Sequence, residues 1–242
     1  MSGAVSSAVG LYLSWLDADL CADATLVAAV GAGSQVLRVG RSETVCAAGA
    51  HRKGCYWLLA GKVKIALLGR DGGERVMDVV LPGTGFGETT LWSDGLDNLC
   101  AEALVDSELL FVGCAAVNAA VERSAAFARA LMRRMCTQSA RLLEDLEGCC
   151  LLSASERVER YLIQNARRSE RFGNHGEVQL PACKSVVASS LNLSAETFSR
   201  ELHRLAGERL LTIDRRTIYL HDIGALERQR RAGRGLREAA VA

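Results

Sequence analysis

The sequence has no apolar run approaching the roughly 20 residues that a membrane-spanning helix requires, and residues 1–10 show no basic segment leading into an apolar core. Neither a membrane span nor a secretion signal is therefore expected, and the protein is predicted to be cytoplasmic, with no membrane as partner. No CxxC pair occurs, and the nine cysteines are odd in number, which argues against a disulfide framework. Most of these thiols are expected to be small buried groups, which leaves one or two for redox sensing.

Histidine is also scarce, with four in the chain and only His51 within residues 1–150. No set of His, Asp and Glu residues converges as metal ligands would, and no nucleophile stands beside a recognisable base. Hydrolytic and metal-assisted catalysis need such groups. The sequence therefore predicts that the protein is not an enzyme.

What is present supports two domains, because 242 residues that are 49% hydrophobic can fill two cores. The net charge of +1 hides an asymmetry between the two halves. Residues 151–242 hold 16 Lys and Arg against 11 Asp and Glu, whereas residues 1–150 hold 13 against 17. The basic C-terminal half is where a polyanion would bind.

The first 40 residues, rich in Ala, Val and Leu, are expected to form one or two short helices. From Val36 to Val112 the pattern changes to short β-favouring runs separated by Gly-rich turns such as Arg70–Gly73 and Pro82–Gly85. Short strands with this punctuation predict an antiparallel β-roll or barrel. The expected strands are Tyr56–Leu59, Val63–Leu68, Arg75–Leu81 and Leu109–Val112.

Residues 115–148 contain no Pro and no internal Gly, and Ala, Leu, Met, Arg and Glu dominate them. Apolar residues recur there at spacings of three, four and seven, which predicts one long helix with an apolar stripe. The stripe either packs on the helix's own β-roll or forms a seam between two helices of a homodimer. The seam is favoured because of the motif that follows the helix. Its proposed residues are Phe127, Leu131, Met135, Leu142 and Leu146.

Residues 181–207 have the pattern of two helices joined by a tight turn. The first helix is expected from about Lys184 to Leu191. Asn192 tolerates the left-handed backbone that such a turn needs, and Ser194 can cap the second helix. The apolar face of the second helix consists of Phe198, Leu202 and Leu205.

The opposite face of that second helix has the chemistry of base readout. An Arg can donate two hydrogen bonds to guanine, and a Glu can accept one from cytosine. Two short β-favouring runs then flank Asp214–Arg216, which predicts a hairpin wing with cations for phosphate at its tip. The predicted contacts with double-stranded DNA are Glu196, Ser199, Arg200, His203, Lys184, Ser194, Arg215 and Arg216.

The run Glu196-Thr197-Phe198-Ser199-Arg200 resembles the E-x-x-S-R recognition signature of Fnr-like regulators, and residues 180–222 resemble the helix-turn-helix and wing of the Crp/Fnr family. The runs at 56–63 and 85–88 are similar to corner motifs of the cyclic-nucleotide-binding β-roll. The likeness is greatest to the regulators of dissimilatory nitrate respiration. It implies a homodimer that binds inverted repeats of TTGAT-like half-sites and works with RNA polymerase.

Together these features predict an α+β protein. An antiparallel β-roll sensor, a jelly roll like the cyclic-nucleotide-binding domain, would occupy residues 1–150, with a long dimerisation helix over about 115–150. A hinge at Gly148–Ser155 would lead to a winged helix-turn-helix over residues 151–228. Residues 229–242 are Arg-rich without apolar periodicity, so they are expected to form a disordered basic tail.

The resemblance also suggests an effector pocket at Gly87, Glu88, Asn98 and Cys100. Cyclic-nucleotide binders of the family follow the Gly-Glu pair with Arg-Ser-Ala, whose Arg neutralises the cyclic phosphate. Here the matching stretch is Asn98-Leu99-Cys100, so cyclic AMP is not expected to bind.

Two further cofactors of the family are weighed in the same way. An iron–sulfur cluster needs four converging thiolates, and Cys21 is the single Cys before residue 40, so the usual cluster is not expected. Haem stays open by analogy with the nitrate-respiration branch. Its axial ligand could be His51 or a cysteine. The polar residues around His51 favour a surface loop instead. The cofactor and any metal therefore stay unassigned.

Three functions are carried forward. The favoured one is a DNA-binding homodimer gated by a ligand or by redox state. The second is a constitutive DNA-binding regulator whose sensor has lost its effector, which the missing Arg supports. The third is a β-roll enzyme or ligand-binding module with an incidental helical domain, which the scarcity of catalytic groups opposes.

Overall fold

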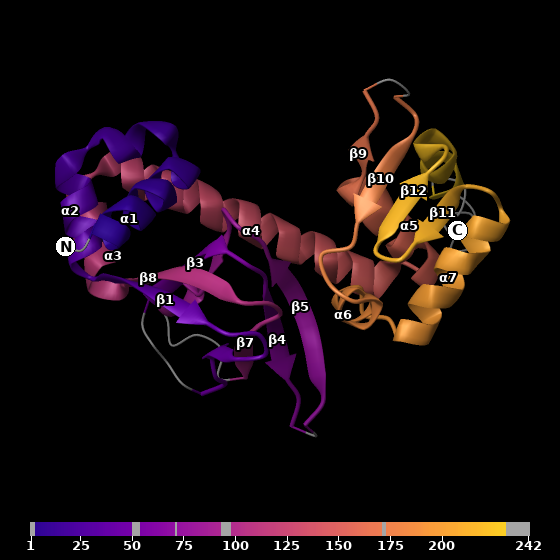
Figure 1. Cartoon of the computed structure of the whole chain (residues 1–242), viewed down its shortest axis with the longest axis horizontal. Helices are drawn as coiled ribbons and strands as arrows, with labels where there is room; N and C mark the ends of the chain where they lie inside the picture. Colours follow the sequence, from indigo (N-terminus) through magenta and orange to yellow (C-terminus); the bar gives the residue numbers. More distant parts are fainter. Residues whose placement is uncertain (1–2, 50–53, 71, 93–97, 171–172, 231–242) are drawn as a thin grey trace, which may run out of the picture. The chain divides into compact units, whose positions relative to one another are not determined.

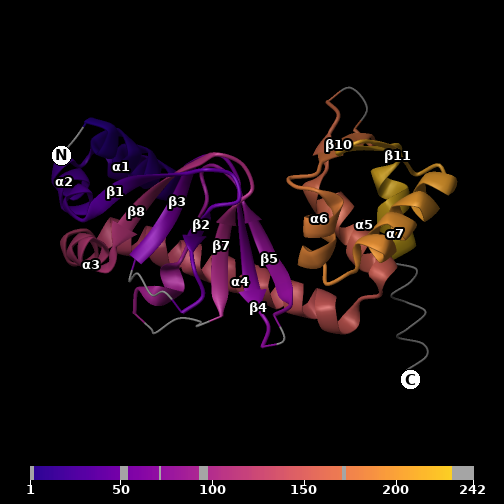
Figure 2. The ribbon, with the colours of Figure 1, turned by 60° about the horizontal axis from the view of Figure 1, so that its bottom comes forward.

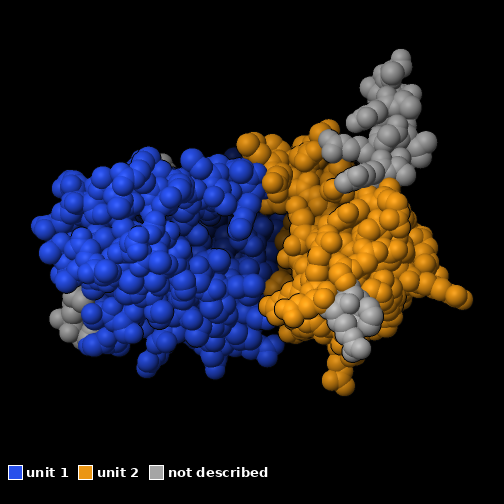
Figure 3. Space-filling view, turned by 90° about the horizontal axis from the view of Figure 1, so that it is seen from above, with its two compact units in different colours: residues 1–142 blue, residues 143–242 orange. Residues whose placement is uncertain are grey.

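The computed structural model describes residues 3–49, 54–70, 72–92, 98–170 and 173–230. The chain divides into two compact units, residues 1–142 and 143–242 (Figure 3). This boundary falls inside helix α4 (Ala125–Leu151), whereas the sequence pattern placed it after the helix. The end of α4 packs on α5 (Ala154–Asn165), where Arg160 donates to the carbonyl of Glu144 at 2.6 Å and pairs with Glu147 at 3.4 Å.

The first unit begins with short helices, as expected: α1 (Gly3–Leu16), the 3₁₀ helix η1 (Ala18–Ala22) and α2 (Ala24–Ala32). Asp23 caps α2, because its carboxylate accepts from the backbone NH groups of the first turn. The three helices gather with α3 (Cys114–Arg123) beside strands β1 and β8 (Figures 1 and 2).

The β-roll of this unit consists of two four-stranded sheets in which every pairing is antiparallel, as predicted. One sheet has the order β1-β8-β3-β6 and the other β2-β7-β4-β5. The expected strands are present, with ends that differ by two residues or fewer. Their bounds are β1 Ser34–Val39, β2 Thr44–Cys46, β3 Gly54–Ala60, β4 Val63–Leu68, β5 Glu74–Val80, β6 Gly85–Phe86, β7 Leu99–Ala103 and β8 Ser107–Gly113.

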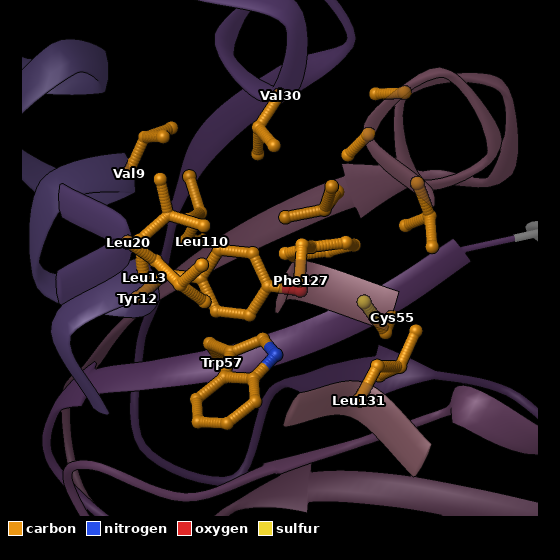
Figure 4. Close-up of a cluster of buried hydrophobic side chains, with 14 of the residues drawn as sticks. Val9, Tyr12, Leu13, Leu20, Val30, Cys55, Trp57, Leu110, Phe127 and Leu131 are labelled. Carbon is orange, nitrogen blue, oxygen red and sulfur yellow. The ribbon is translucent and has the colours of Figure 1, made fainter. Parts of the chain in front are cut away.

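Strand β3 separates two hydrophobic cores, because its side chains alternate between the two faces of its sheet. Tyr56 and Leu58 point into the roll, where Tyr56 stacks on Phe86 with ring centroids 5.0 Å apart. Cys55 and Trp57 point the other way, into a core closed by the helices (Figure 4). The sheet is therefore buried on both faces, which explains why β3 is a continuous apolar run rather than an alternating one.

The long helix expected over 115–148 is two helices, so that prediction was wrong in one respect. The chain breaks at Ser124, whose backbone is extended at φ −133° and ψ 103°. Its hydroxyl accepts from the NH of Phe127 at 3.2 Å, which caps the start of α4. The composition of the segment hides this break because Ser, unlike Pro or Gly, is also tolerated inside helices.

The second unit folds around α5, whose N-terminus carries the capping box that Ser153 and Glu156 form. It also contains α6 (Lys184–Ser190), α7 (Ala195–Gly207) and a helix over residues 223–230. Its antiparallel sheet has the order β11-β12-β10-β9. The strands are β9 Arg167–Arg168, β10 Gly176–Gln179, β11 Leu211–Asp214 and β12 Thr217–Leu220.

The prediction that the disordered tail starts at residue 229 was wrong, because residues 229 and 230 belong to the helix over residues 223–230 and Gln229 donates to Glu208 at 3.2 Å. Residues 231–242 lie outside the described residues. Among the described helices, none is both long and apolar enough to cross a membrane.

Candidate nucleic-acid interface

Helices α6 and α7 are joined by a turn whose backbone is set by local residues. Asn192 takes the left-handed conformation at φ 56°, as its side chain type suggested. The NH of Leu193 then donates to the carbonyl of Ala188 at 2.9 Å, which closes the turn. Ser194 begins the second helix, because its hydroxyl accepts from the NH of Thr197 at 3.0 Å. The predicted helix-turn-helix is present at the predicted residues.

Helix α7 has one buried face and one exposed face. Phe198, Leu202 and Leu205 are fully buried in the core of the second unit. Glu196 and Arg200, four residues apart and so one turn apart on the other face, are exposed. Neither makes an ion pair or side-chain hydrogen bond with any residue in the described part of the chain. Both are therefore free to contact an external ligand.

His203 lies one turn after Ser199 on the same side of α7. Its Nδ1 is 2.7 Å from the carbonyl oxygen of Ser199 and 3.4 Å from the Ser199 hydroxyl. Since a carbonyl oxygen only accepts, Nδ1 is the donor in its contact with the Ser199 carbonyl. The pair thus presents one more polar group beside Arg200.

The remaining predicted DNA contacts lie at the edges of this helix pair and in the wing. Lys184 is the first residue of α6 and is half-buried, and Ser194 is the exposed cap of α7. The wing is the β11–β12 hairpin, and its turn is Arg215-Arg216, with Arg215 at φ 53°. Both arginines are exposed. The hairpin therefore presents two cations, which is the arrangement suited to a phosphate backbone.

Sequence reasoning missed the role of Arg157 on α5. Its guanidinium donates to three backbone carbonyls, those of Leu152 at 3.2 Å, Leu191 at 3.1 Å and Asn192 at 3.0 Å. The last two belong to the turn between α6 and α7. These carbonyls follow the end of α6, where no further helical NH is present to satisfy them. Arg157 therefore fixes the turn from outside the motif.

Replacing Arg157 with Ala is expected to lower the free energy of unfolding of the second unit by about 1–3 kcal/mol, because up to three carbonyls lose a charged donor. DNA affinity should fall, because the turn between α6 and α7 would be less well ordered without Arg157. The preference for particular bases should stay unchanged. Thermal unfolding and binding-site selection measure the two effects. Arg157→Lys is the matched control, and it should rescue only in part, since one ammonium cannot replace the planar fork. A variant with normal stability would contradict this role.

A second arginine anchors α7 to α5. Arg204 donates to Glu159 at 3.0 Å and to Glu201 at 2.9 Å, and it also bonds the Ser155 hydroxyl. Burial raises the pKa of Glu159, and the hydrogen bonds from Ser155 and Arg204 oppose that shift. This network holds α7 against the core, which keeps the exposed face of that helix in a fixed orientation.

The predicted effector residues have different surroundings. Gly87 takes a left-handed backbone at φ 93° and precedes Glu88, which is 3% exposed. Cys100 lies on β7 opposite Ala66, and the amide of Asn98 donates to the carbonyl of Leu68 at 3.3 Å.

The Glu88 carboxylate already has a cationic partner, which the sequence did not reveal. Arg134 of α4 donates to its Oε1 at 2.6 Å and also to the carbonyl of Gly85. The Arg134 guanidinium in turn lies 4.3 Å from the centroid of the Trp57 ring, a cation–π contact. An internal ion pair therefore ties the β6–η2 corner of the roll to α4 (η2, Glu88–Thr90).

The apolar stripe predicted for the dimer seam divides between two faces of α4. Phe127 and Leu131 are 0% and 2% exposed and belong to the core of their own unit (Figure 4), and Met135 packs against that core. These three residues therefore pack within their own unit, which is the alternative to a dimer seam. Leu142 and Leu146, by contrast, are 52% and 58% exposed.

The β-roll, the helix-turn-helix with its wing and the free polar face of α7 together define the class of DNA-binding transcription regulators with a β-roll domain. A model described as a cyclic nucleotide-binding domain matches residues 36–124, and one described as a Crp-like helix-turn-helix domain matches residues 156–229. The chain belongs to the Crp/Fnr family of regulators.

Two relatives and one solved structure illustrate this membership. The chain is 30% identical over 165 residues to the nitrogen fixation regulation protein FixK of Rhizobium meliloti (strain 1021), covering 68% of this chain and 72% of that protein. It is 22% identical over 206 residues to the CRP-like cAMP-activated global transcriptional regulator of Mycobacterium tuberculosis (strain ATCC 25618 / H37Rv), covering 85% of this chain and 92% of that protein. The structure of FixK2 from Bradyrhizobium japonicum has the same fold, with a TM-score of 0.68 at 23% identity over 81% of this chain and 96% of that one.

Proposed function

We propose that the protein is a homodimer that binds an inverted repeat of TTGAT-like half-sites and regulates transcription in the cytoplasm together with RNA polymerase. The observation that carries this proposal is that Glu196 and Arg200 lie on the exposed face of α7 without a side-chain partner in the described part of the chain. The opposite face of α7 is buried in the core of the second unit. The same pair supports a place near the dissimilatory nitrate respiration branch, through the E-x-x-S-R pattern.

The wing and the helix-turn-helix would divide the work of binding. Arg200 would donate both hydrogen bonds to a guanine, and Glu196 would accept from a cytosine amino group. Arg215, Arg216 and Lys184 would contact phosphates, which give affinity without sequence information. Two copies are needed because a pair of recognition helices reads half-sites one helical turn, roughly 34 Å, apart.

A direct test is selection of binding sites from random DNA duplexes by the purified chain, followed by gel shifts at several salt concentrations. The proposal expects two half-sites in inverted orientation and an affinity that falls steeply with salt. Selection of no motif would contradict sequence-specific regulation and would favour the alternative of a β-roll module with an incidental helical domain.

The sensor domain is proposed to respond to a signal other than cyclic AMP. Glu88 is held by Arg134, and the position at which the family's phosphate-binding Arg stands is Asn98 here. We expect titration with cyclic AMP up to ~1 mM to give no saturable heat. A dissociation constant of ~1 mM corresponds to a binding free energy of only about −4 kcal/mol. The cAMP-activated M. tuberculosis relative is the positive control for titration calorimetry. Micromolar binding by the present chain would refute this prediction.

Haem gating is suggested by the resemblance to the nitrate-respiration branch, and the surroundings of Cys55 and Cys100, two of the cysteines in the first unit, do not favour it. Cys55 is fully buried, and burial raises the pKa of its thiol to about 12. Burial also raises the pKa of Cys100. In the absence of a metal, neither site therefore favours the thiolate form. His51 lies outside the described residues, so no step of the proposed function runs through haem.

A constitutive regulator is the second candidate, favoured by the internal Glu88–Arg134 pair, which already neutralises the Glu88 carboxylate within the protein. Gel shifts with and without candidate effectors, in air and under anaerobic conditions, separate the two. Gating requires an affinity that changes with one of these conditions, whereas a constitutive regulator requires the same affinity in all of them.

A further inference from the structure

Helix α4 carries a second, exposed row of residues, of which the predicted seam contained only Leu146. Its members follow one another at alternating spacings of four and three, which is the seven-residue repeat of a two-stranded coiled coil. Every one of them is exposed in the single chain. The row consists of Met132, Cys136, Ser139, Leu143, Leu146 and Cys150.

This row lies on the side of α4 that faces away from the unit's own core. Phe127 and Cys136 are nine residues apart, roughly two and a half turns, so they point to opposite sides of the helix. The core side is filled, since Phe127 is fully buried. Leu143 and Leu146, however, are 67% and 58% exposed. Because burial of a leucine side chain is favourable, covering these two residues would stabilise the protein.

A second copy of the chain is the occupant that fits this row. Of the segments outside the described residues, only 231–242 is long enough to follow several turns of helix, and it holds three Arg, two Gly and a single Leu without a seven-residue repeat. An identical α4 supplies the matching repeat. The inference therefore rests on the homodimer proposed above.

In a parallel pair of identical helices related by a two-fold axis along the seam, each residue of the row meets its own counterpart. Cys136, Leu143 and Cys150 occupy equivalent positions of the repeat, seven residues apart. Each of the two cysteines would then lie beside the same cysteine of the other chain. We propose that Cys136 and Cys150 are sites of interchain disulfide formation, which lock the dimer covalently under oxidation.

The chemistry balances with a peroxide as the oxidant. The thiolate of Cys150 attacks a peroxide oxygen, the O–O bond breaks, and a sulfenic acid and hydroxide form; the hydroxide takes a proton from solvent and becomes water. The partner's Cys150 thiolate then attacks the sulfenic sulfur, so that the S–S bond forms, the S–O bond breaks and hydroxide leaves, which solvent protonates to a second water. Cys150 is one residue from the end of α4, where the last turn can adjust to the Cα separation of roughly 4.4–6.8 Å that disulfides require. Cys136 lies mid-helix and is expected to cross-link more slowly.

A covalent lock would change how DNA binding depends on protein concentration. A reduced dimer dissociates on dilution and loses the second half-site, whereas a cross-linked dimer keeps both recognition helices together. Oxidation would therefore preserve operator binding at protein concentrations at which the reduced protein releases the DNA.

The test uses the full chain, treated with hydrogen peroxide and run on a non-reducing denaturing gel, with sedimentation of the reduced protein alongside. We expect a covalent dimer from the wild type and from each of Cys136→Ser and Cys150→Ser, and loss of that band in the double variant. Cys149→Ser is the matched control, because Cys149 adjoins Cys150 but lies off the row, and it should cross-link like the wild type.

Two results would overturn the inference while leaving the proposed function intact. One is a covalent dimer that persists in the double variant. The other is a reduced protein that sediments as a dimer and binds the inverted repeat but gives no covalent dimer. A third result would refute the homodimer itself, and the disulfide with it: a chain that sediments as a monomer both alone and when bound to a single half-site.

Discussion

Arg200→Ala is expected to abolish sequence-specific DNA binding at physiological salt. A bidentate arginine–guanine contact is worth about 1–3 kcal/mol of discrimination, and a dimer would lose two of them. At about 1.4 kcal/mol per factor of ten, the affinity for the selected operator should fall roughly thirtyfold to twenty-thousandfold. The fold should survive, because Arg200 is exposed and has no side-chain partner within the described part of the chain.

Binding-site selection with wild type, Arg200→Ala and Glu196→Ala makes the prediction specific. Glu196 would lie near phosphates, so its removal also relieves repulsion. Glu196→Ala should therefore relax the preference at one base position at a smaller loss of total affinity. Arg38→Ala is the charge-matched control, since Arg38 forms a surface pair with Glu108 in the first unit. If all four proteins select the same motif equally strongly, the proposed readout is wrong.

The predictable parts of this fold are those in which local chemistry and packing agree. The turn at Asn192, the cap at Ser194 and the buried face of α7 all follow from residue type and spacing. In the same way, Gly-rich turns between short apolar runs predicted the roll. Each of these features depends on neighbours within a few residues along the sequence.

The features that sequence reasoning missed depend on partners far along the chain. Glu88 and Arg134 are 46 residues apart, and Arg157 and Asn192 are 35 apart. A charged residue on an amphipathic helix reads as solvent-exposed, and nothing in its own neighbourhood shows that a second element will cover it. The prediction of the dimer seam on α4 was partly wrong for the same reason. Both faces of the helix are apolar, and only the packing shows which face is already covered by the core.

The division of α4 into two faces leads to the second prediction with a large effect. Leu146→Glu should convert the protein to monomers with little change in the stability of either unit. If α4 pairs with its counterpart, the variant removes two buried leucines, worth roughly 3–6 kcal/mol together, and places two carboxylates against each other. The dimer dissociation constant should rise about a hundredfold or more. Operator affinity should fall with it, because one recognition helix alone holds one half-site.

Sedimentation at several concentrations, read beside thermal unfolding, separates this effect from simple misfolding. Thr137→Glu is the matched control: it adds the same carboxylate at an exposed position of α4 outside the row, and it should leave the dimer intact. Leu131→Glu should behave differently, since it buries an unpaired carboxylate in the core of the first unit and should lower the melting temperature of that unit. A Leu146→Glu protein that remains a dimer would show that the exposed face of α4 is not the seam. In that event the second recognition helix would have to be brought to the operator by some other surface of the chain.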